Sequence, residues 1–455
     1  MKKILQLALG IVTSVGGFLE IGSIATAAQA GAGFGYQLVW SVVLGTICIA
    51  FLVEMSGRCS AVSKHTIPDA MRERFGARFY AVPLVVMLAV SLLVLAAELG
   101  GVAAALQMAT GISIPVWAIP VLLLAWALLW YTNFSTIENG VSLLTLGAEV
   151  GGVAAALELA TGISIPIWAI PVTFVSWVLL WKATFGVIEN GVSGLGLVTL
   201  AFAVGAVKLH PDYVGAARGL IPTLTAHHAA LYWFIAVSVL GASVSPYLYY
   251  FYSSGAIEEG WDKSFVPMNR VVAAVGMTFG GLLSIAVLVC AARVFHPAGI
   301  EVQKYQQLPQ LLSTPLGHTG FWLFVASLGI GCFGATLEIS LALAYLVAQG
   351  FGWNWGKDQR PSEDARFSLM YTVIIVVAGL LSLVGLDPLK LTEMAMALTS
   401  ASLPVGVLPF LILMNDREYL GEFTNGHIGN AVVMFVSVLA MIVAVVAIPL
   451  EIFGS

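Results

Sequence analysis

Long apolar runs recur along the whole chain, and they constrain the fold more than any other feature of the sequence. Each run is near twenty residues long, as in 36–53, 271–292 and 432–450. A helix of about twenty residues crosses roughly 30 Å of hydrocarbon. Because lipid offers no partners for backbone N–H and C=O groups, such runs must be helices. The alternating pattern of a β-barrel is absent from the sequence.

The composition agrees with a membrane environment. Apolar residues make up 59% of the chain and charged residues only 9%, whereas a soluble domain carries about a quarter charged residues. Lys2 and Lys3 precede the first apolar run without a small-residue cleavage site after it, which argues against a removable signal peptide. The four cysteines lack C-x-x-C spacing, so they indicate small core residues and not a disulfide framework or a metal site.

The hydropathy pattern predicts an all-α polytopic membrane protein with one transporter domain over residues 1–455. We expect thirteen helices, centred on 4–33, 36–60, 79–110, 114–132, 137–161, 165–183, 187–208, 230–254, 270–293, 318–350, 366–385, 390–414 and 429–450. With the N-terminus in the cytoplasm, fourteen of the nineteen Lys and Arg residues fall on the cytoplasmic side. This asymmetry follows the positive-inside rule and predicts a multi-pass protein of the plasma or inner membrane.

A tandem repeat lies in the first half of the chain. Residues 98–142 match residues 149–193 at 31 of 45 positions, with an offset of 51. Solenoid arrays need several such units, so a duplicated helix pair is the simpler interpretation. We expect the extra hairpin, at 137–183, to lie at the periphery of the helix bundle. Two extra helices leave the orientation of the later helices unchanged.

Two apolar runs are interrupted by helix-breaking residues. Residues 16–23 (GGFLEIGS) place the carboxylate of Glu20 beside three glycines, and residues 241–246 (GASVSP) combine glycine, serine and proline. Interrupted helices free backbone carbonyls near the midplane, where they bind cations in transporters. Glycine and proline also serve helix packing. Glu20 favours a functional site, because a charge inside the membrane is costly and usually functional.

The sequence resembles the NRAMP divalent-metal transporters in several stretches. Residues 17–35 (GFLEIGSIATAAQAGAGFG) are similar to the first helix of that family, with its DPGN motif and the AT-x-x-QAGA-like stretch that follows it. Three further stretches resemble parts of that family. Residues 58–75 are similar to its second helix and the following loop, and residues 241–253 to its sixth helix with the A-x-x-MPH motif. Residues 403–425 are similar to its tenth helix and the following loop. The resemblance implies a leucine-transporter-type fold of inverted repeats with discontinuous helices. The duplicated pair departs from the family's eleven or twelve helices.

The resemblance also implies a metal site with altered ligands. The motif's Asp falls on Glu20 and its Asn on Ser23, while the alanine whose carbonyl binds metal falls on Ala242. The metal-binding Met falls on Ser245, and the His of MPH falls on Tyr247. Carboxylate, hydroxyl and carbonyl oxygens suit Mg²⁺, Ca²⁺ or Mn²⁺, whereas a thioether favours softer metals. We therefore expect a hard-oxygen site. The resemblance implies the same preference, because relatives that carry magnesium lack this Met.

Other acids are candidates for gating or coupling. Glu98 matches the second acid of the family's D-x-x-E pair on the third helix, but Leu95 replaces the first. Glu338 has no partner that the sequence reveals, and Tyr247 occupies a histidine position of the family. Glu54 precedes Arg58 by four residues, which predicts a helix ion pair. The seven histidines fall outside the predicted helix centres, so proton coupling of the family's usual kind is not expected.

The sequence thus predicts a secondary transporter that moves divalent cations by alternating access, with the cation as substrate and no cofactor. A transporter of a small organic solute or amino acid on the same fold is an alternative, although the charge of Glu20 disfavours a substrate carboxylate there. A non-transporting membrane scaffold is a second alternative. No nucleophile–base pair, phosphate loop or Cys/His cluster indicates an enzyme, and nothing indicates a nucleic-acid partner.

Overall fold

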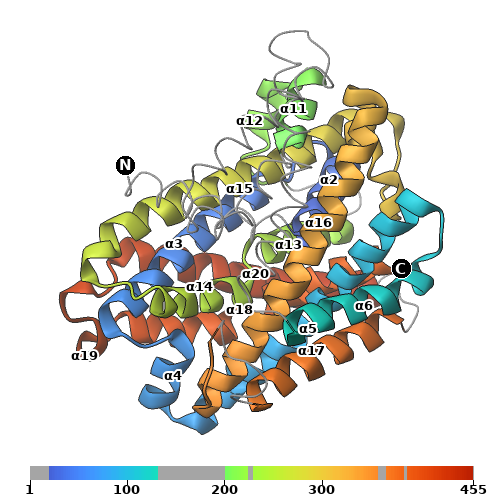
Figure 1. Ribbon diagram of the computed structural model, residues 1–455. Helices are drawn as coiled ribbons and strands as arrows, with labels where there is room; N and C mark the ends of the chain where they lie inside the picture. The colour runs from blue at the N-terminus through green and yellow to red at the C-terminus, as the bar shows by residue number, and fades with distance from the viewer. Residues whose placement is uncertain (1–19, 132–199, 224–228, 357–364, 384–386, 454–455) are drawn as a thin grey trace, which may run out of the picture.

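The structure, a computed structural model, describes residues 20–131, 200–223, 229–356, 365–383 and 387–453, and these ranges are helical between short connections (Figure 1). The long helices are α2 (Ile21–Phe34), α3 (Val39–Ser63), α5 (Ala77–Thr110), α6 (Ile114–Tyr131), α13 (Ala229–Ser243), α14 (Pro246–Glu258), α15 (Val266–Val294), α16 (Gln310–Phe351), α17 (Ala365–Leu383), α18 (Pro388–Met414) and α20 (His427–Phe453). The short helices are α4 (Ile67–Phe75), α11 (Leu200–Lys208), α12 (Tyr213–Arg218) and α19 (Arg417–Leu420).

Most of the predicted helices are confirmed in the described ranges, and nine described helical segments are long and apolar enough to cross a membrane. The chain is therefore a multi-pass membrane protein. The helices predicted at 137–161 and 165–183 lie outside the described residues, as does the proposed peripheral hairpin. For the same reason, only the C-terminal part of the first predicted helix, α2, can be compared.

The segment predicted as one helix at 230–254 is two helices in the structure. α13 ends at Ser243, and α14 begins at Pro246 after Ser245 adopts an extended conformation with φ −74° and ψ 116°. Proline lacks the N–H that would continue the helical hydrogen bonds, but its fixed φ suits the first turn of a new helix. The interruption predicted from the residues at 241–246 is confirmed.

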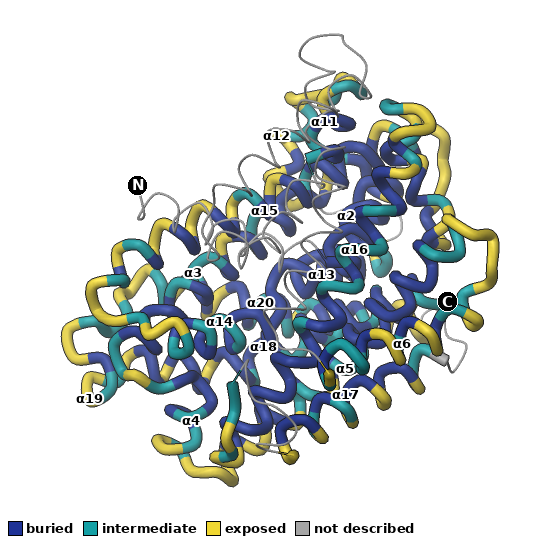
Figure 2. Tube along the Cα trace, viewed as in Figure 1, coloured by how far each residue is buried: buried dark blue, intermediate teal, exposed yellow. Residues whose placement is uncertain are grey.

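α2 and the interrupted pair α13 and α14 lie in the middle of the bundle. α2 packs against α13 and α15, and α13 packs against α18, while α5 packs against both α16 and α18. Figure 2 shows α2 and α13 as mainly buried, whereas α6 and α17 have exposed positions on their outer faces. The exposed side chains of α6 include Val116, Ile119 and Leu123. Such an apolar outer face is the surface that a membrane protein presents to lipid.

Candidate metal centre

The start of α2 and the break between α13 and α14 meet at the carboxylate of Glu20. Glu20 precedes the first residue of α2 and has extended backbone dihedrals, φ −88° and ψ 175°. Ser245, in the break between α13 and α14, donates a hydrogen bond from Oγ to Glu20 Oε1 at 3.0 Å. Tyr247, in the first turn of α14, donates from its hydroxyl to Glu20 Oε2 at 2.5 Å. Both carboxylate oxygens therefore face the second broken helix.

A further hydrogen bond joins α2 to α13 one turn away. Ser23 Oγ donates to the backbone carbonyl oxygen of Ala242 at 3.3 Å. Within α2, Thr26 Oγ1 donates to the carbonyl oxygen of Gly22 at 2.7 Å. The structure thus brings together all five residues that the resemblance selected, namely Glu20, Ser23, Ala242, Ser245 and Tyr247.

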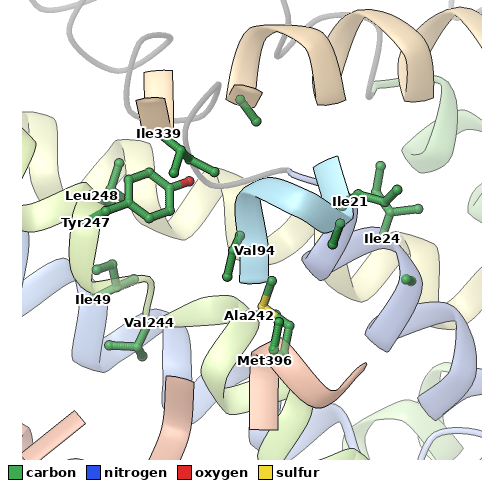
Figure 3. Packing of buried hydrophobic residues seen from close by; sticks show 14 of the residues in the cluster. Ile21, Ile24, Ile49, Val94, Ala242, Val244, Tyr247, Leu248, Ile339 and Met396 are labelled. Atoms are coloured by element: carbon green, nitrogen blue, oxygen red, sulfur yellow. The ribbon is translucent and has the colours of Figure 1, made fainter. Parts of the chain in front are cut away.

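The junction is enclosed by the protein interior. Glu20 is 2% exposed, and the four other residues of the junction are buried as well. Figure 3 shows apolar side chains packed nearby, among them Ile21, Val94 and Ile339. A carboxylate in such surroundings has lost most of its hydration, so a cation that reaches it gains a strong electrostatic interaction.

The hydrogen bonds to Glu20 come from neutral hydroxyl groups. A hydroxyl can donate to a carboxylate or turn its lone pairs toward a cation. The Ser245 hydroxyl and the Ala242 carbonyl can therefore join the carboxylate as oxygen ligands. Within the described residues, no three His, Cys, Asp or Glu side chains are grouped so as to hold a metal ion. A cation bound here would accordingly rely on hydroxyl and carbonyl oxygens beyond the carboxylate.

Two further acids lie close to Glu20. Glu98, on α5, is fully buried, and its Oε1 accepts a hydrogen bond from the backbone N–H of Ile21 at 3.2 Å. The Cys332 thiol of α16 lies beside the same carboxylate. Glu338, also on α16, is partly exposed and within electrostatic range of both Glu20 and Glu98. Both acidic side chains therefore lie near the start of α2.

Sequence reasoning missed Met396, which lies in the middle of α18. A Cβ atom added to Gly22 would lie 2.3 Å from Met396 Cε and 2.8 Å from its Sδ. A Cβ added to Gly241 would lie 1.8 Å from the Met396 carbonyl oxygen. Met396 is thus packed against both α2 and α13. No local signal marks it, because it occupies a regular helix among other apolar residues.

The family comparison matches almost the whole chain. The family described as natural resistance-associated macrophage protein-like, or Nramp, matches residues 10–147 and 140–449. The two matched segments overlap at residues 140–147, across the end of the first copy of the tandem repeat.

Curated relatives agree with this match. The chain is 26% identical over 425 residues to a divalent metal cation transporter, MntH, of Aeromonas hydrophila subsp. hydrophila, with 91% of this chain and 88% of the relative covered. It is 25% identical over 416 residues to the transporter of the same name from Klebsiella pneumoniae, with 90% and 85% covered.

Solved structures show the same fold. The manganese transporter of Eremococcus coleocola matches with a TM-score of 0.73 at 16% identity, over 100% of this chain and 88% of that one. Mhp1, a nucleobase-cation-symport-1 family transporter, matches with a TM-score of 0.50 at 13% identity, over 97% and 91%.

Proposed function

The chain belongs to the Nramp family of metal transporters, and from this premise we propose that it carries divalent metal cations across the membrane through the site at Glu20. The observation that carries the proposal is the position of Glu20, whose two carboxylate oxygens contact the second broken helix through neutral hydroxyls. The curated relatives named as divalent metal cation transporters support the substrate class. Members of this family are transporters and not enzymes.

We propose that the site prefers hard cations such as Mg²⁺ and Mn²⁺. Glu20, Ser23, Ser245 and the Ala242 carbonyl offer only oxygen atoms, and oxygen donors suit these ions. A site for an organic carboxylate is disfavoured, because the Glu20 charge would repel it in surroundings of low dielectric constant.

The contacts at the junction suggest how access alternates. Side-chain hydrogen bonds join α2 to α13 and α14 at Glu20 and Ser23. Such bonds can be exchanged for ligand bonds without unwinding either helix. A cation that replaces the hydroxyl donors at Glu20 would therefore change how α2 is held against α14, which is the rearrangement that alternating access requires.

We also propose that the end of the bundle that carries α4 is cytoplasmic. Three basic side chains at this end make contacts across helices: Arg58 with the segment after α19, Lys64 with the Trp261 carbonyl, and Arg74 with Asp416. Basic residues concentrate on the cytoplasmic side of membrane proteins.

Cation flux in proteoliposomes tests the proposed function. We expect the purified chain to move Mn²⁺ and Mg²⁺ into vesicles loaded with a fluorescent indicator, and empty vesicles to show only leakage. Competition by small organic solutes and amino acids should leave the cation flux unchanged. Absence of flux for all divalent cations, together with uptake of a labelled amino acid, would establish the alternative of an organic-solute transporter.

A substitution at Ser245 tests which residue faces the ion. We expect Ser245→Met to raise the affinity for Cd²⁺ relative to Mg²⁺, because a thioether is a softer ligand than a hydroxyl. Competition of each ion against Mn²⁺ uptake measures the change. Ser245→Leu is the matched control, because it adds similar bulk without sulfur. If the two variants have the same Cd²⁺-to-Mg²⁺ preference, residue 245 does not face the cation.

A further inference from the structure

Met396 occupies the place where α2 and α13 approach α18. Its side chain lies over Gly22, where a Cβ would come within 2.8 Å of the sulfur, and its carbonyl oxygen lies over Gly241. Figure 3 shows the Met396 side chain extending toward Ala242. At these two glycines there is no side chain to separate α18 from α2 and α13.

The contact falls next to residues of the proposed site. Gly22 immediately precedes Ser23 and follows Glu20 by two positions, while Gly241 immediately precedes Ala242. The end of the Met396 side chain, including the sulfur, contacts the α2 side of this junction. Met396 is also completely buried. The sulfur, on a third helix, thus packs against the residue of α2 that lies between Glu20 and Ser23 in the first turn.

Methionine fills irregular gaps in many helix bundles, so packing alone would explain an apolar side chain here. Two features of Met396 are not explained by the filling of a packing gap. The sulfur lies at the first turn of the helix that follows the carboxylate, and the side chain has three rotatable bonds through which the sulfur can move. A thioether is moreover the donor that selects softer metals. Packing and metal binding predict different results for a leucine at this position.

We propose that Met396 provides the cation site with a thioether ligand from α18. The oxygen ligands come from Glu20, Ser23, Ala242 and Ser245, and the Met396 sulfur is an additional, softer ligand. With it, the transporter accepts Cd²⁺ as well as Mg²⁺ and Mn²⁺. Soft ions recruit the sulfur, whereas hard ions are held by oxygen and water. This inference rests on the proposed function, since it assigns a further ligand to the same site.

X-ray absorption on Cd²⁺-loaded protein tests the inference directly. The Cys332 thiol lies beside Glu98 and could bind Cd²⁺ itself, so the measurement uses Cys332→Ser as background. We expect a Cd–S distance in this background and its loss in Cys332→Ser/Met396→Leu. Spectra with oxygen neighbours alone in the Cys332→Ser protein would overturn the inference. This first measurement needs no change at residue 396, so it stands even if the leucine variant folds poorly.

Binding measurements separate the inference from the proposed function. We expect Met396→Leu to weaken Cd²⁺ binding by about tenfold or more, a loss typical of altered metal sites, with Mg²⁺ binding nearly unchanged. Met277→Leu is the matched control, because Met277 is equally buried on α15. Equal Cd²⁺ affinity in wild type and Met396→Leu, with Mg²⁺ binding retained, overturns the role of Met396 alone. Failure of the wild-type protein to bind any divalent cation contradicts the proposed function as well.

Discussion

Glu20→Ala is expected to abolish divalent cation transport while the chain still folds. The substitution removes the charged ligand of the site, and the hydroxyl and carbonyl oxygens that remain are neutral and cannot replace its attraction for a cation. The loss of two hydrogen bonds, from Ser245 and Tyr247, is partly offset because a buried charge is removed as well. Mn²⁺ uptake in proteoliposomes measures the effect, and the elution profile in detergent reports folding.

Three companion variants separate charge from structure. Glu20→Asp should retain part of the uptake because it keeps a carboxylate, whereas Glu20→Gln should lose it despite a similar shape. Glu258→Ala is the matched control: Glu258, at the end of α14, also accepts a hydrogen bond from a tyrosine, Tyr345, at 2.6 Å. It should transport nearly as well as wild type. Undiminished Mn²⁺ uptake in Glu20→Ala would contradict the assignment of the cation site to Glu20.

Local chemistry explains why much of the fold could be predicted from the sequence. In lipid, the backbone N–H and C=O groups of each apolar run must form hydrogen bonds within the run, so the positions of the helices follow from the apolar runs alone. The break at 241–246 could also be predicted, because proline and glycine act within a single turn. The predicted start of the tenth helix at 318 also agrees with the structure. α16 is interrupted at Gly317, whose φ of +64° and ψ of −148° are not helical, so the part predicted at 318–350 follows this interruption. Glycine tolerates this conformation, which explains why the chain can change direction there.

Contacts between distant segments could not be predicted from the same information. The segments around residues 20 and 245 could be identified from their helix-breaking residues, but the individual ligand positions were assigned through the family resemblance, because nothing local connects residue 20 with residue 245. Met396 was missed for the same reason: its position depends on how α18 crosses α2 and α13. Glycines 22 and 241 do indicate a close approach, but the sequence cannot say which helix approaches them. Which helix packs against α2 and α13 at the site therefore depends on the tertiary packing of the helices.

Arg58 makes one contact that could be predicted from the sequence, because it is local, and other contacts that could not be predicted, because they join distant segments. The predicted ion pair with Glu54 is confirmed, with Nε and Nη2 each 2.9 Å from a carboxylate oxygen. Arg58 also donates to the Phe423 carbonyl and, at 2.7 Å, to Asn425 Oδ1. These contacts hold α3 to the segment between α19 and α20. Arg58 is only 5% exposed, so its charge depends on these partners.

We therefore expect Arg58→Ala to lower the free energy of unfolding by about 3 kcal/mol, the lower end of the cost of breaking a buried ion pair. The loss is not larger because Arg270 still contacts Glu54, at 3.4 Å. Denaturant unfolding in detergent micelles measures the change. In a double-mutant cycle, Glu54→Gln should cost much less in the Arg58→Ala background than in wild type, because the pair is already broken.

Arg74→Ala is the matched control for this prediction. Arg74 pairs with Asp416 at 2.6 Å, also between the α4 end and the segment after α18, but its side chain is 48% exposed. The backbone N–H of Glu418 and the Arg74 guanidinium hold the pKa of Asp416 below its usual range. Exposed ion pairs contribute little to stability because water already solvates both charges. If the Arg58 and Arg74 variants lose the same small amount of stability, burial does not strengthen the Arg58 contacts. The connection between α3 and the segment before α20 would then depend on apolar packing.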